Sequence, residues 1–136
     1  MTIDTLTVLK ASAAETSGTD GAGTALDLVG NWGRIFAVIT ISEVRGTSTP
    51  TKLDLVFEGS RDNVNWFPVA VAPQLKSTGT YRVSIYGAES VDHTPTCTPL
   101  FAFRERPRYL RSNSTVTAGT GGATPDSITY SVHLTA

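Results

Sequence analysis

The chain has 136 residues, of which 12 are acidic and 11 are basic, so its formal net charge is −1 at pH 7. This length fits one domain, residues 1–136. The charge balance argues against a nucleic-acid-binding protein, which would normally show a clear basic excess. Charged residues make up only 17% of the chain, and uncharged Thr and Ser take their place. Because near-neutral surfaces tend to associate, we expect an assembly.

No apolar run approaches the roughly 18–20 residues that cross a bilayer, so we expect no membrane partner. The first residues lack the basic start and apolar middle of a signal peptide, so we expect a protein that is made and used in the cytoplasm or carried out of the cell inside a larger particle. The single cysteine, Cys97, has no partner for an intrachain disulfide and offers no metal-binding cluster.

In chain order, residues 1–11 alternate poorly, which predicts an N-terminal arm or an edge strand. Residues 14–23 form a Gly/Ser/Thr-rich loop, and residues 24–29 a short strand. Residues 34–44 give the strongest strand pattern. Its early part is apolar on both faces, which is typical of a central strand in a packed sheet.

The segment 52–72 is the clearest unit of the chain. Leu53, Leu55 and Phe57 alternate with polar residues, which indicates a half-buried strand. Gly59 and Ser60 are expected to end that strand. A polar turn follows, and Trp66 is predicted to anchor the base of the hairpin before the second strand begins.

Later segments continue the pattern. Residues 81–86 alternate as a strand, 87–99 are irregular, 111–118 are extended and 119–125 form a Gly-rich loop. Residues 128–135 alternate without a fault. Short strands separated by Gly, Pro, Ser and Thr turns predict an all-β fold: a single antiparallel β-sandwich, jelly-roll-like, with long Gly/Thr-rich loops.

The Gly-rich segments 18–23 and 119–124 have the glycine content of phosphate cradles. Neither has the Lys-Ser/Thr pair of a P-loop and neither leads into a helix, so we interpret them as mobile loops that a neighbouring subunit orders. Asp62, Asn63 and Asn65 offer clustered oxygens but too few carboxylates for Ca²⁺. We expect an Asx-type turn there and no metal or other cofactor.

The two histidines do not suggest catalysis. His133 lies on the polar face of the last predicted strand, and His93 follows Asp92 in a Pro-bounded segment. An Asp-His pair with a Ser nucleophile is conceivable, but adjacent residues of an extended chain point opposite ways. The chain also lacks the Gly-x-Ser-x-Gly elbow. We expect no catalytic residues and no enzymatic activity.

Arginine is concentrated in one short stretch. Arg104, Arg106 and Arg108 recur at every second position, so in an extended backbone they share one face, and Arg111 lies nearby. One interpretation is a charged strand edge that discourages unwanted pairing. The other is an interface patch for an acidic partner surface, since Arg is favoured at interfaces.

Trp32 and Trp66 each flank a turn. Aromatic residues beside polar loops can form a sugar-stacking platform. With two tryptophans in the chain, we interpret both as structural anchors of the core.

Three segments together resemble a known family: the hairpin FEGSRDNVNW at 57–66, RYLRSNSTVT at 108–117 and ITYSVHLT at 128–135. The chain from about Ile35 onward is similar to the small β-sandwich virion proteins of tailed bacteriophages. Those proteins have a Gly-Ser-x-Asp-x-x-Asn-Trp turn and an Arg-Tyr-Leu-Arg strand. Asn63 departs from the pattern, because the turn often has Gly there. The resemblance supplies no catalytic residues.

The resemblance implies a capsid decoration (cement) protein on the outer surface of the virion, or a tail or head–tail connector subunit. The expected partners are the major capsid protein and copies of the chain itself, with a trimer preferred. As hypotheses, the four arginines contact acidic neighbours and residues 1–11 act as an arm. A carbohydrate-binding module that uses Trp32 or Trp66 is the alternative from another class.

Overall fold

The computed structural model describes residues 7–28, 35–46, 48–86, 107–121 and 126–135. These ranges form strands, turns and loops. None of them contains a helix long and apolar enough to cross a membrane. Six residues singled out in the sequence lie outside the described ranges: Trp32, Asp92, His93, Cys97, Arg104 and Arg106.

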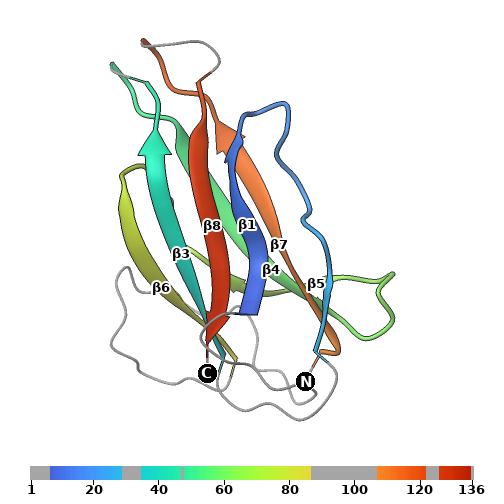
Figure 1. The fold of residues 1–136 in the computed structure, drawn as a ribbon. Coiled ribbons are helices and arrows are strands. Elements are labelled where there is room, and N and C mark those ends of the chain that lie inside the picture. The colour runs from blue at the N-terminus through green and yellow to red at the C-terminus, as the bar shows by residue number, and fades with distance from the viewer. Residues whose placement is uncertain (1–6, 29–34, 47, 87–106, 122–125, 136) are drawn as a thin grey trace.

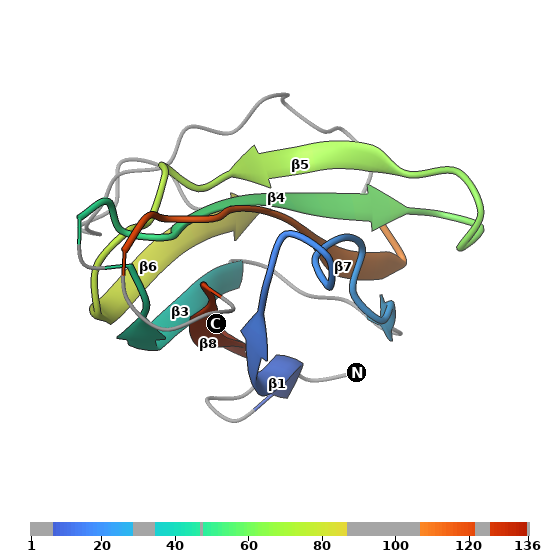
Figure 2. The same ribbon diagram turned by 90° about the horizontal axis from the view of Figure 1, so that it is seen from above.

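The described chain folds into eight strands: β1 (Thr7–Glu15), β2 (Leu26–Asp27), β3 (Ile35–Val44), β4 (Lys52–Ser60), β5 (Phe67–Val71), β6 (Gly79–Tyr86), β7 (Tyr109–Thr117) and β8 (Ile128–Thr135). Sheet A has the order β1-β8-β3-β6, and sheet B has the order β2-β7-β4-β5. All pairs are antiparallel, and the two sheets face each other (Figures 1 and 2). The prediction of an antiparallel β-sandwich is confirmed.

Strand pairing is nested along the chain. β1 pairs with β8, β2 with β7, β3 with β6 and β4 with β5. Only β4 and β5 are consecutive strands of the same sheet, and every other step between consecutive strands crosses to the opposite sheet. The chain therefore pairs like one long hairpin that has been folded over into two layers.

Three central strands supply most of the core, and each follows the period-two pattern of its sequence. Burying one such aliphatic or aromatic side chain contributes about 1.5–3 kcal/mol relative to leaving it in water. The inward side chains are at most 2% exposed: Ile35, Ala37, Ile39 and Ile41 on β3, Leu53, Leu55 and Phe57 on β4, and Ile128, Tyr130, Val132 and Leu134 on β8.

Phe36 shows how sheet A covers an apolar residue on its outer face. Its neighbours Ile35 and Ala37 point into the core, so Phe36 points outward, yet it is only 4% exposed. The guanidinium of Arg82 on β6 lies 4.1 Å from the centroid of the Phe36 ring. A cation over an aromatic face is attracted by the ring quadrupole, and the guanidinium covers part of the ring.

One predicted boundary was wrong. β1 continues through Glu15, into the predicted loop, because Ala14 and Glu15 pair with Thr129 and Ile128 of β8. β4 ends at Ser60, as predicted, but Gly59 is still paired within the strand. A β-carbon at position 59 would lie 2.8 Å from Cβ of Pro107, so glycine is needed there for close packing and not for a turn.

The N-terminal segment has a defined place from Thr7 onward. Residues 7–11 belong to β1, which is the outer strand of sheet A. Residues 1–6 lie outside the described ranges, so the prediction of an arm applies only to that part of the segment.

Candidate functional site

The loop between β4 and β5 projects beyond the ends of the sheets (Figure 2) and is organised by Asp62. One carboxylate oxygen of Asp62 accepts hydrogen bonds from the backbone N–H groups of Val64 (2.9 Å) and Asn65 (2.8 Å). The other accepts a bond from the Asn65 side-chain amide at 2.7 Å. Ser60 Oγ donates to Asp62 and accepts from the Asn63 N–H. These bonds make the predicted Asx-type turn.

The electrostatics of the loop follow from these bonds. Donation by the backbone of Asn65 and Val64 lowers the pKa of the Asp62 carboxyl well below its usual range. Asn63 has φ = 61°, in the left-handed region, which Asn tolerates better than most residues. The loop holds Val64 in solvent, where it is 75% exposed. The result is a preorganised tip with one apolar side chain.

Trp66 is half-buried and does not belong to the core cluster, so the prediction of a core anchor was wrong for this residue. The guanidinium of Arg111 lies 4.0 Å from its ring centroid. Arg111 also donates to Glu58 at 2.8 Å, and the side-chain amide of Asn113 approaches the same oxygen at 3.4 Å. Trp66 therefore packs against a polar ladder on the outer face of sheet B, which consists of Glu58, Arg111 and Asn113.

Of the four arginines predicted to form an interface patch, the structure describes two, and both are paired within the chain. Arg108 donates to the two carboxylate oxygens of Asp27, at 3.2 and 3.1 Å. That hydrogen bond raises the pKa of Arg108 above its ordinary value. Arg111 pairs with Glu58 across the β4–β7 ladder. Each arginine thus presents a neutralised ion pair, and contact with an acidic partner stays a prediction.

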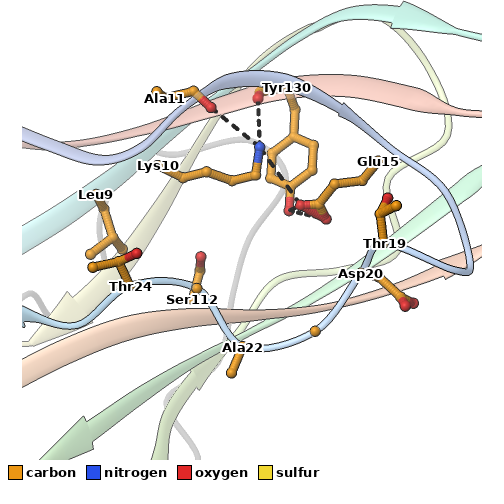
Figure 3. A pocket seen from close by; sticks show the side chains of 12 residues that line it. Leu9, Lys10, Ala11, Glu15, Thr19, Asp20, Ala22, Thr24, Ser112 and Tyr130 are labelled. Atoms are coloured by element: carbon orange, nitrogen blue, oxygen red, sulfur yellow. Dashed lines mark hydrogen bonds and ion pairs between the residues drawn. The ribbon is translucent and has the colours of Figure 1, made fainter.

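A polar cluster that the sequence did not reveal lies at the open side of the sandwich, where β1 faces residues 19–24 across a pocket of about 240 Å³ (Figure 3). Glu15 accepts hydrogen bonds from the hydroxyls of Tyr130 (2.8 Å) and Ser114 (2.7 Å). The Lys10 ammonium lies 3.7 Å from Glu15 and 3.9 Å from the centroid of the Tyr130 ring. The cluster therefore joins sheet A to β7 of sheet B.

Burial shifts the pKa values of two groups in the cluster, Tyr130 and Lys10. It raises the pKa of the Tyr130 hydroxyl well above its ordinary value, an effect that the nearby Glu15 carboxylate adds to, so Tyr130 remains a donor. Burial also lowers the pKa of Lys10, and Glu15 partly opposes that shift. The Lys10 ammonium also donates to the carbonyl oxygens of Tyr130 (3.2 Å) and Ala11 (3.3 Å). Through these contacts the polar groups join β1 to β7 and β8.

The Gly-rich segments are held by the chain's own backbone where the structure describes them. Gly21 N–H donates to Ser114 Oγ at 3.2 Å and Gly23 N–H to the Ser112 carbonyl at 2.7 Å. Gly119 N–H donates to Thr51 Oγ1 at 3.2 Å. These hydrogen bonds hold the described parts of both segments within the chain, and ordering by a neighbouring subunit stays a prediction. The amide groups of Gly21, Gly23 and Gly119 are engaged in these bonds and are not turned toward a phosphate.

His133 is half-buried on the outer face of β8, opposite Val38 of β3. Among the described residues no group of three or more His, Cys, Asp and Glu side chains could hold a metal ion.

Comparisons of the chain with protein-family models, with curated proteins and with solved structures found no match.

Proposed function

We propose that the chain is a structural protein of a bacteriophage virion: a capsid decoration protein that binds the outer surface of the major capsid protein lattice. The observation that carries the proposal is the nested pairing of eight strands in two four-stranded sheets. We interpret that strand order as jelly-roll-like, and jelly rolls are used by viral capsid domains and by lectins. Between a viral capsid domain and a lectin, the segments that resemble phage virion proteins favour the viral capsid domain.

The surface chemistry supports a lattice-binding role over an electrostatic one. Arg108 and Arg111 are neutralised by Asp27 and Glu58 within the chain, and the net charge is −1. Binding would then depend on apolar and uncharged polar contacts that are repeated on a lattice. Many weak tethered contacts give avidity without one strong site.

In this proposal the protein is not an enzyme and needs no cofactor. Its partners are the major capsid protein and copies of itself in a symmetric homo-oligomer, and neither nucleic acid nor membrane is a partner. The Glu15 cluster then has a structural role, because its two hydroxyls donate to the Glu15 carboxylate and its ammonium pairs with Glu15 and donates to a backbone carbonyl.

Purification of the native particle tests the proposal. We expect the chain to co-sediment with mature capsids and to rebind, when added as pure protein, to capsids from which it has been stripped. Binding to tails, or assembly of the pure protein into large rings or tubes, would support a tail or connector subunit instead. Failure to associate with any particle would contradict a virion role.

The ladder on sheet B favours one function of another class, carbohydrate binding. Trp66, Arg111 and Asn113 place an aromatic ring beside hydrogen-bonding groups, a combination that suits sugar recognition. Trp32 lies outside the described residues. A monomer that binds glycans and loses binding on Trp66→Ala, but not on Val64→Ala at the hairpin tip, would support this alternative.

A further inference from the structure

The open edge of β1 differs from the other sheet edges. β8 is the only strand that pairs with β1 in the part of the chain that the structure describes, and Figure 2 shows β1 at the outer end of sheet A. An edge strand presents a row of backbone N–H and C=O groups to any strand that comes alongside. Natural proteins usually guard such edges with proline, exposed charge, bulges or short length.

The other three edges carry such guards, whereas the only guards on β1 are two bulges. β2 has only two residues. β5 contains Pro68, which has no N–H group to donate, and its ladder with β4 has a bulge beside that residue. β6 carries Arg82, whose side chain is exposed although its guanidinium lies over the Phe36 ring.

β1 has charged residues at two positions, but both side chains fold away from the edge. Lys10 lies against the Tyr130 ring and the Tyr130 carbonyl oxygen, and Glu15 is held by Ser114 and Tyr130. The four residues between them, Ala11–Ala14, are small, uncharged and exposed. Val8, on the same strand, is one of two large apolar side chains exposed among the described residues.

The bulges of β1 limit where a partner strand fits. Its register with β8 shifts between Val8 and Lys10 and again between Lys10 and Ala13. Pairing is regular from Ala13 to Glu15, so the second bulge ends at Ala13, within the run of exposed small residues. An incoming strand would therefore be centred on the C-terminal half of β1.

We propose that β1 pairs antiparallel with β1 of a second copy of this chain, about a two-fold axis near Ser12 and Ala13. A two-fold contact is isologous, so the segment must complement itself. Small uncharged residues meet this condition, because no like charges oppose each other across the axis. The two copies of sheet A would then form one continuous sheet in the order β6-β3-β8-β1-β1-β8-β3-β6.

The inference rests on the self-association in the proposed function and specifies its geometry. It gives a dimer, whereas the sequence alone predicted a trimer. A trimer requires a heterologous interface, in which two different surfaces meet. Light scattering of the pure protein therefore separates the two.

The test combines light scattering with site-specific cross-linking. We expect the wild-type protein to have the mass of a dimer and Ser12→Lys to have the mass of a monomer, because two lysines would meet at the axis. Thr40→Lys, on the exposed outer face of β3, is the matched control and should stay dimeric. All three should show the same circular dichroism spectrum.

For cross-linking, Cys97→Ser removes the only native cysteine. In that background, Ser12→Cys or Ala13→Cys should oxidise to a disulfide-linked dimer, and Val64→Cys at the hairpin tip should not. A wild-type monomer at every concentration, or a trimer that Ser12→Lys leaves intact, would overturn the proposal. Neither result would change co-sedimentation with capsids, so the virion role is tested separately.

Discussion

Asp62 and Glu15 each collect several hydrogen bonds, but across very different lengths of chain. The partners of Asp62 lie two or three residues away. Those of Glu15, Ser114 and Tyr130, lie 99 and 115 residues away. The first carboxylate shapes one exposed loop, and the second joins the two sheets. The contrast shows that similar chemistry has local or global consequences according to which segments it connects.

Replacing Glu15 should have the largest effect. Glu15→Ala leaves the hydroxyls of Tyr130 and Ser114 without their acceptor and leaves the Lys10 ammonium without its counter-ion. We expect a loss of roughly 3 kcal/mol in the free energy of unfolding. Urea denaturation measures it. The control is Glu43→Ala, which breaks an exposed ion pair with Arg45 and should cost at most about 1 kcal/mol. Equal losses would contradict a bridging role for Glu15.

The backbone of the Asp62 loop gives the next effect. Asn63 has φ = 61°, a conformation that costs an ordinary residue roughly 1–2 kcal/mol. Asn63→Val should therefore destabilise the protein by about that amount in thermal or urea unfolding. Asn63→Gly is the matched control, because glycine adopts this conformation without a steric penalty. If both variants unfold alike, backbone strain at this position is not important.

Removing one hydroxyl from the Glu15 cluster should have a smaller effect. Tyr130→Phe keeps the buried ring and deletes only the donor to Glu15, so we expect a loss of about 1 kcal/mol in the free energy of unfolding. Ile39→Val, elsewhere in the core, gives the scale for a purely apolar change. Wild-type stability in Tyr130→Phe would mean that Ser114 and Lys10 satisfy Glu15 alone.

The pH dependence of the Asp62 loop should be the smallest effect and a local one. The folded pKa of Asp62 lies below its unfolded value, so the folded state binds fewer protons and its stabilisation is fully present above about pH 4. It is lost as the pH falls from there toward the folded pKa. We expect the Val64 and Asn65 amide protons to exchange faster on acidification in NMR experiments, after correction for intrinsic rates. In Asp62→Asn this acid-dependent change should disappear.

The features that could be predicted from the sequence depend on neighbours in the chain. The period-two pattern of residues 128–135 predicted the strand that became β8, and Asp62 with Asn65 indicated an Asx-type turn. Both signals arise within a few residues. They therefore required no knowledge of the partner strands.

The features that could not be predicted depend on tertiary neighbours. β1 extends to Glu15 because β8 lies beside it, and Gly59 is needed because Pro107 packs against it. Trp66 was expected in the core, but the Arg111 side chain that covers it comes from a strand far away in sequence. No periodicity within one segment reports which distant segment will meet it.

The nested pairing has a consequence for synthesis on the ribosome. In sheet A, β8 lies between β1 and β3. Neither β1 nor β3 can therefore pair with β8 until residues 128–135 have been translated. Until then β3, which is apolar on both faces in its first half, lacks one of its two flanking strands. Strands exposed in this way are prone to aggregation until the missing strand has been synthesised. Nascent chains that stop short of residue 128 should therefore depend on chaperones to stay in solution.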